Sequence, residues 1–208
     1  MSDFDVSRIV PSTRDLLGAI HTRRKGLALV PHVEGDDEEA VAREVARLDG
    51  LDVRAFALSD AGPLARAAAT STDSTPSLCL AEATSAEDCQ RARFYGADGV
   101  GVRFGAEPPL EKMAQSMRMM ALGHATSIDD ARAAVDAGAR AVLFVGSVDD
   151  ALAVGETIGP PVLVVAHVVP GVDRNGLRKL DGIVDAAVVP ATLHRADDFE
   201  ALLEELDS

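Results

Sequence analysis

The sequence predicts an α/β fold, a single-domain (β/α)8 barrel (TIM barrel) that is compact and has short loops. Apolar runs of strand length alternate with segments of helical periodicity along the 208 residues. A helix–glycine–strand junction recurs at Gly50, Gly96, Gly138 and Gly182, at intervals of 46, 42 and 44 residues. Each interval has the length of two strand–helix units, so the four quarters make eight units.

An open doubly wound sheet would also alternate strands and helices. The barrel is favoured because eight strands can be placed one by one. The expected strands cover residues 27–33, 53–58, 77–82, 99–104, 118–123, 141–145, 162–168 and 185–189. Helices are expected from residue 36 through 48, at 63–70, at 86–95, from the prolines at 108–109 to about 117, from 127 to 138, at about 148–157, at 177–180 and at 197–206.

The segment 76–105 gives the clearest single strand–helix–strand unit. Its helix has Glu87 and Asp88 in the first turn and Arg91 and Arg93 later, an order that suits the helix dipole. Gly96 then ends the helix before the next apolar run. The domain is expected to span residues 1–208, with an N-terminal tail and a short helix (about 13–24) in 1–25 and the barrel in 26–208.

Composition excludes several function classes. The net charge of −14 argues against nucleic acid and anionic membranes as partners, and nothing in the sequence indicates a particular protein partner. No apolar run reaches 18 residues, so no membrane span is expected. The polar, acidic N-terminus does not resemble a signal peptide, and two cysteines fit a reducing compartment, so a cytoplasmic location is expected.

Active sites of (β/α)8 barrels lie where the strands end and the βα loops begin. Four of the five histidines fall at such positions, and three of them, His32, His124 and His167, lie at inward strand ends. Together with Glu82 they are the candidate catalytic residues. The imidazoles would act as general acids and bases, or would hold a divalent metal such as zinc with one position left open. The third interpretation is that they only fill a disused pocket.

A small phosphorylated molecule is a candidate ligand. The loop PGVDRNG at residues 170–176 lies beside the seventh strand, where barrels often bind phosphate, although the same composition is typical of an ordinary turn. Arg103 ends the fourth strand and would meet an anion, or would pair outward with acids of the following helix. The candidate ligand- and phosphate-binding residues are Arg103, Gly171, Arg174, Asn175, Gly176 and Thr192.

Three segments resemble indole-3-glycerol-phosphate synthases. They are residues 76–100, 122–145 and 184–199. The resemblance implies a (β/α)8 barrel and a carbon–carbon lyase of tryptophan biosynthesis that needs no metal or cofactor. It is most specific at the end of the helix within the first segment, where the family's pattern matches Ala92, Arg93, Tyr95, Gly96, Ala97 and Asp98.

The sequence departs from this family at the positions that carry its chemistry. Alignment places Leu80 at the family's catalytic lysine and His124 at its catalytic glutamate, and leucine has no proton to transfer. Likewise His32 and His167 replace a lysine and a glutamate, and Pro190 replaces a phosphate-binding glycine. No lysine is expected at the mouth of any strand.

We therefore expect a divergent homologue, a pseudoenzyme candidate that has lost the lysine-dependent ring closure and binds a ligand or a partner. Two alternatives remain open: an enzyme with histidine-based, possibly metal-dependent chemistry at the barrel mouth, and a retained indole-3-glycerol-phosphate synthase.

Overall fold

A computed structural model describes residues 4–21 and 26–206 and confirms the (β/α)8 barrel. All strand pairs are parallel, and the order around the sheet is β1-β8-β7-β6-β5-β4-β3-β2. β1 and β2 meet through a single bridge between His32 and Ala57, which nearly closes the barrel. The strands are β1 (Ala28–Pro31), β2 (Phe56–Leu58), β3 (Ser77–Ala83), β4 (Gly99–Val102), β5 (Met120–Ala125), β6 (Ala141–Gly146), β7 (Leu163–Val168) and β8 (Ala186–Val189).

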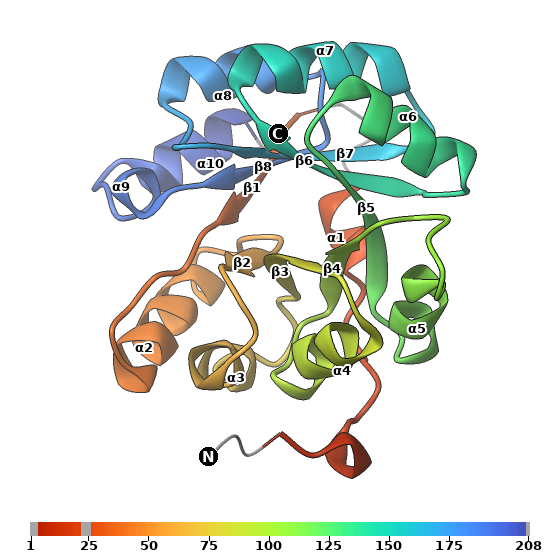
Figure 1. Cartoon of the computed structure of the whole chain (residues 1–208). Helices are drawn as coiled ribbons and strands as arrows, with labels where there is room; N and C mark the ends of the chain where they lie inside the picture. Colours follow the sequence, from red (N-terminus) through yellow and green to blue (C-terminus); the bar gives the residue numbers. More distant parts are fainter. Residues whose placement is uncertain (1–3, 22–25, 207–208) are drawn as a thin grey trace.

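Helices surround the strands on the outside, as Figure 1 shows. A 3-10 turn and a short helix come first: η1 (Val6–Arg8) and α1 (Leu16–Ile20). The others are α2 (Glu38–Asp49), α3 (Pro63–Thr70), α4 (Ala86–Phe94), α5 (Leu110–Ser116), α6 (Ile128–Asp136), α7 (Val148–Ile158), α8 (Arg174–Leu180), α9 (Ala191–His194) and α10 (Phe199–Leu206). Among the described residues, no helix is long and apolar enough to cross a membrane.

Local chemistry fixes where these helices begin and end. The Ser85 hydroxyl accepts the amide of Asp88 at 3.1 Å, and the Asp88 carboxylate accepts the amide of Ser85 at 2.9 Å, which forms a capping box at the start of α4. Ser127 caps α6 as the sequence predicted. Gly96 and Gly138 follow α4 and α6 with positive φ values of 102° and 98°, a conformation that glycine adopts without steric cost.

Several sequence-based boundaries were wrong. Arg118 adopts a φ of 57°, which lies in the left-handed region and not in the β region, and β5 begins at Met120. α8 begins at Arg174 because Asp173 caps it, and α9 was not predicted. The helix expected at about 13–24 is only Leu16–Ile20, and residues 1–3 and 22–25 of the expected N-terminal segment lie outside the described part of the chain.

The core has an inner and an outer layer. Outward-facing strand residues pack under the helices, while inward-facing residues of all strands but β4 fill the barrel with small and branched side chains. Leu16 and Ile20 of α1 close the amino-terminal end of this interior. α1 fits there because β4 presents Gly99, where a Cβ atom would lie 2.2 Å from the Leu16 side chain. The inner layer comprises Ala28, Val30, Ala55, Ala57, Leu78, Leu80, Leu122, Ala141, Leu143, Leu163, Val165, Ala186 and Val188.

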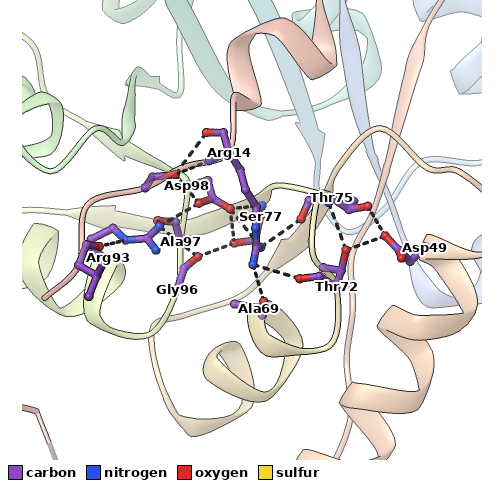
Figure 2. Close-up of polar contacts among 12 residues, drawn as sticks. Arg14, Asp49, Ala69, Thr72, Thr75, Ser77, Arg93, Gly96, Ala97 and Asp98 are labelled. Atoms are coloured by element: carbon purple, nitrogen blue, oxygen red, sulfur yellow. Dashed lines mark hydrogen bonds and ion pairs between the residues drawn. The ribbon is translucent and has the colours of Figure 1, made fainter. Parts of the chain in front are cut away.

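A buried polar network ties the N-terminal segment to the amino-terminal face of the barrel (Figure 2). Asp98, whose side chain is 1% exposed, accepts hydrogen bonds from Arg93 at 2.8 Å and from the Ser12 hydroxyl at 2.6 Å. It also accepts the amide of Ser77 at 2.9 Å and contacts Arg14 at 3.5 Å. This face of a barrel supports stability rather than catalysis.

The pair of hydrogen bonds between Asp98 and Ser77 has an equivalent on the opposite side of the barrel. Asp98 and Ser77 exchange two hydrogen bonds, with both amide donors 2.9 Å from their acceptors. Asp185 and Val164, each 87 residues further along, make the same two bonds at the same distances. The two halves of the barrel therefore repeat the same aspartate-to-strand hydrogen-bond pair, in agreement with the regular glycine spacing.

Candidate functional site

The three candidate histidines converge at the carboxyl ends of the strands. Side chains alternate along a strand, so a residue two positions beyond an inward one also faces inward. His32, His124 and His167 each come two positions after an inward-facing apolar residue. These residues are Val30, Leu122 and Val165, and all three belong to the buried interior. The imidazoles therefore form the next layer of the barrel, above the apolar core.

His32 and His167 lie against one another. Their ring centroids are 6.2 Å apart and the rings are inclined at 70°. His32 Nε2 is hydrogen-bonded to the Ser59 hydroxyl at 2.8 Å, and its Nδ1 lies 3.6 Å from the Glu34 carboxylate. Burial lowers the pKa of His32 from its usual 6.5, and the Glu34 carboxylate acts in the opposite direction. Burial also lowers the pKa of His167, and the charges of His32 and His124 lower it further. Burial therefore favours the neutral form of both rings.

His124 pairs with Glu82 rather than with the other imidazoles. Its Nδ1 lies 3.6 Å from Glu82 Oε2. Both side chains line a cavity of about 510 Å³ that extends from the barrel mouth toward α6. Arg103 also lines it, and within the described part of the chain this guanidinium has neither a hydrogen bond nor an ion pair, so the outward salt bridge considered from the sequence does not form. The cavity is lined by Glu82, Arg103, Phe104, His124, Thr126, Asp130, Ala133 and Ala134.

The residues expected to bind phosphate after β7 are arranged mostly for structural contacts. The amide of Gly176 donates to the Asp173 carboxylate at 2.7 Å, and this acid would repel an anion. Gly176 is buried, and a Cβ atom there would lie 2.8 Å from Val172. Arg174 is engaged by Asp198 in an ion pair. Gly171, Asn175 and Thr192 are exposed.

Sequence reasoning missed the role of His194 on α9. This side chain is fully buried, and its Nε2 donates to the backbone carbonyl of His32 at 2.9 Å. Its Nδ1 lies 3.0 Å from Glu44 Oε1 on α2, outside good hydrogen-bond geometry. Burial lowers the pKa of His194, while the carbonyl and Glu44 act against this shift. His194 thus holds the backbone of His32, and the only sequence signal for it was its place after the last strand.

Across residues 4–21 and 26–206, no group of three His, Cys, Asp or Glu side chains is arranged to hold a metal ion. The metal at the three histidines therefore stays a prediction from the sequence. Lys112 and Lys179 lie on helices α5 and α8, and Lys25 lies outside the described residues. Leu80 is buried in the barrel interior, and its hydrocarbon side chain has no proton to transfer.

A further cavity of about 440 Å³ lies at the amino-terminal end of the barrel, beside α1. Most of its lining comes from the N-terminal segment and from residues at the beginnings of β5 and β6, and no histidine lines it, so its position fits the stabilising face of the fold.

Comparison with known proteins identifies the fold class only. No family model and no curated protein matches the chain. A thiamine phosphate pyrophosphorylase from Pyrococcus furiosus superposes with a TM-score of 0.60 at 18% identity, over 89% of this chain and 96% of that one. A cube-shaped, highly porous protein cage, designed by fusing symmetric oligomeric domains, gives a TM-score of 0.58 at 14% identity, over 80% of this chain and 64% of that one. At such identities the likeness establishes a (β/α)8 barrel, and membership of the indole-3-glycerol-phosphate synthase family is not shown.

Proposed function

We propose that this barrel binds a small phosphorylated molecule at its carboxyl-terminal face, in the cavity between the ends of β3, β4 and β5. The observation that carries the proposal is the cavity of about 510 Å³ that Arg103, His124 and Glu82 line together. Arg103 would neutralise the anion, because a guanidinium offers several donors that match phosphate oxygens.

The His124–Glu82 pair would move a proton on the bound molecule. The charge of the Glu82 carboxylate, 3.6 Å from Nδ1, would favour the proton on that nitrogen, which would leave Nε2 available to accept one. The chemistry would therefore depend on histidine. The name of the structurally similar thiamine phosphate pyrophosphorylase includes a phosphate compound, which supports an anionic ligand for a barrel of this shape.

Ring closure of the indole-3-glycerol-phosphate synthase type is the weaker candidate. That family uses a lysine where this chain has Leu80, and this leucine is only 7% exposed within the barrel. We propose instead a divergent relative of that family that kept the scaffold and lost the lysine-dependent reaction. Its two cysteines are free, which fits the reducing cytosol that we propose as its location.

Titration with ribose 5-phosphate tests the proposal. The chain has five histidines, so ¹H–¹³C signals of the imidazole rings can be assigned and followed individually. We expect saturable shifts of the His124 signals, and we expect Arg103→Gln to weaken binding by about 10- to 150-fold, as loss of a charge-assisted hydrogen bond of about 1.5–3 kcal/mol would do.

Arg43→Gln is the matched control, since it removes the same charge from an exposed pair on α2. Absence of a saturable shift at His124, or equal affinities of the two variants, would refute the proposal. A phosphorylated anilino-sugar offered to the same protein is expected to bind without turnover.

The metal alternative has a separate test. Elemental analysis measures the metal content of the purified protein and of a variant in which His32, His124 and His167 are all changed to Ala. The difference between the two is the metal that the three histidines hold. We expect no such metal, because no three ligands among the described residues are placed to share one ion. A near-stoichiometric metal that disappears in the variant would replace acid–base chemistry with metal chemistry.

A further inference from the structure

A serine hydroxyl, an imidazole and a carboxylate are neighbours at the carboxyl ends of β1 and β2. His32 Nε2 lies 2.8 Å from the Ser59 hydroxyl, and its Nδ1 lies 3.6 Å from Glu34 Oε1. A nucleophilic hydroxyl needs a base within hydrogen-bond distance and a third group that orients the base. These three side chains are placed for those roles, and the phosphate site proposed between β3, β4 and β5 uses none of them.

The pairing of β1 with β2 brings the serine to the histidine. The bridge between His32 and Ala57 sets the register, and Ser59 follows Ala57 by two positions, so it faces the same side of the sheet. Val30 and Ala57 belong to the buried apolar layer beneath the pair, while Ser59 is exposed. The site is therefore shallow, which suits a small substrate.

Neighbouring side chains restrain His32. His194 Nε2 donates to the backbone carbonyl of His32 at 2.9 Å, and the ring of His167 packs against the His32 ring with 6.2 Å between centroids. The His32 side chain is only 16% exposed. The charge of the Glu34 carboxylate would favour the ring proton on Nδ1, which would leave Nε2 to accept the proton of the Ser59 hydroxyl.

Backbone amides beside the serine are available to stabilise negative charge. Within the part of the chain that the structure describes, the amides of residues 59–62 donate no hydrogen bond. They lead into α3, whose first turn has no side-chain cap because Gly62 occupies the N-cap position. Free amides at this end of a helix dipole would stabilise an oxyanion that forms at Ser59.

We infer that Ser59, His32 and Glu34 form a nucleophilic site that hydrolyses small carboxylic esters. Ser59 Oγ attacks the ester carbonyl carbon while its proton passes to His32 Nε2. The bond from this carbon to the leaving oxygen then breaks, and that oxygen takes the proton from Nε2 and departs as the alcohol.

Water completes the reaction. It attacks the carbonyl carbon of the acyl-serine and gives one proton to His32 Nε2, and the bond between this carbon and Ser59 Oγ breaks as Oγ takes that proton back. The products are the carboxylic acid and the original serine. Ser59 and His32 are thus catalytic residues, and Glu34 is a positioning residue. The inference does not depend on the function proposed for the β3–β5 cavity.

A fluorophosphonate ester tests for the nucleophilic serine. Diisopropyl fluorophosphate transfers its phosphoryl group to such a hydroxyl as the P–F bond breaks and fluoride and the serine proton leave. We expect the intact mass to show one group per chain and peptide mapping to locate it at Ser59. The same protein should release 4-nitrophenolate from 4-nitrophenyl acetate. Ser59→Ala should abolish labelling and lower the rate of hydrolysis at least about 100-fold.

Ser116→Ala is the matched control, because it removes an exposed serine hydroxyl on α5 that donates to the backbone carbonyl of Met113 at 2.7 Å. It should be labelled and should hydrolyse the ester as the unmodified protein does. Glu34→Gln, at an exposed position, should lower kcat and leave KM unchanged, since the carboxylate acts on His32 and not on the substrate.

Circular dichroism establishes that the variants fold. No labelling of the unmodified protein, labelling at another residue, or equal rates for Ser59→Ala and Ser116→Ala would overturn the inference. An unchanged kcat in Glu34→Gln would also overturn it, because the carboxylate would then not orient the base.

Discussion

Replacing Asp98 by Asn removes the buried carboxylate that two partly buried arginines share. The Asp98 side chain is 1% exposed, and its partners Arg93 and Arg14 are 14% and 17% exposed. Breaking a buried ion pair by removing one partner costs about 3–5 kcal/mol. Because both guanidinium groups keep some contact with water, we expect the lower end, about 3 kcal/mol. With an m-value of about 2–3 kcal/mol/M, the urea midpoint should fall by about 1 M or more.

Urea unfolding followed by circular dichroism measures this change. Arg43→Gln breaks an exposed pair on α2 and should change the free energy of unfolding by no more than about 0.5 kcal/mol. A cycle with Arg93→Gln should give a coupling of about 0.5–3 kcal/mol, since the two side chains touch at 2.8 Å. A cost of less than about 1 kcal/mol for Asp98→Asn would show that the carboxylate does not anchor the N-terminal segment.

Two further predictions concern titratable groups. Burial lowers the pKa of His32, His167 and His194 below 6.5, so below about pH 6.5 the unfolded chain binds more protons than the folded one, and the free energy of unfolding declines as the pH falls through the lowered pKa values. The urea midpoint should therefore be lower at pH 5.5 than at pH 7.5. A His32→Asn/His167→Asn variant should lose less stability between these two pH values, and a loss equal to that of the unmodified protein would contradict the assignment. Burial raises the pKa of Cys79 and Cys89 to about 11, so neither thiol should react with a thiol-specific disulfide reagent at pH 8 until urea unfolds the chain. Rapid labelling of the folded protein would contradict this prediction.

The resemblance to indole-3-glycerol-phosphate synthases is strongest at the amino-terminal face of the barrel, opposite the face where (β/α)8 barrels place their active sites. Its best match ends at Asp98, and the structure places that residue in the buried network with Arg93. A motif that fixes the amino-terminal face is a property of the scaffold, and another barrel can share it without sharing a reaction. This explains why the sequence predicted the fold well while the catalytic positions disagreed with the family.

The sequence by itself determined the alternation of strands and helices, because apolar periodicity and helix caps such as Ser85 and Ser127 are local. It also placed three histidines at strand ends, since inward and outward positions alternate with a fixed period.

Tertiary structure decided which of these side chains meet. The pairing of His124 with Glu82, the support of His32 by His194 and the hydrogen bond between Ser59 and His32 each join distant segments. Such contacts depend on barrel closure and on helix packing, and no local rule of spacing encodes them.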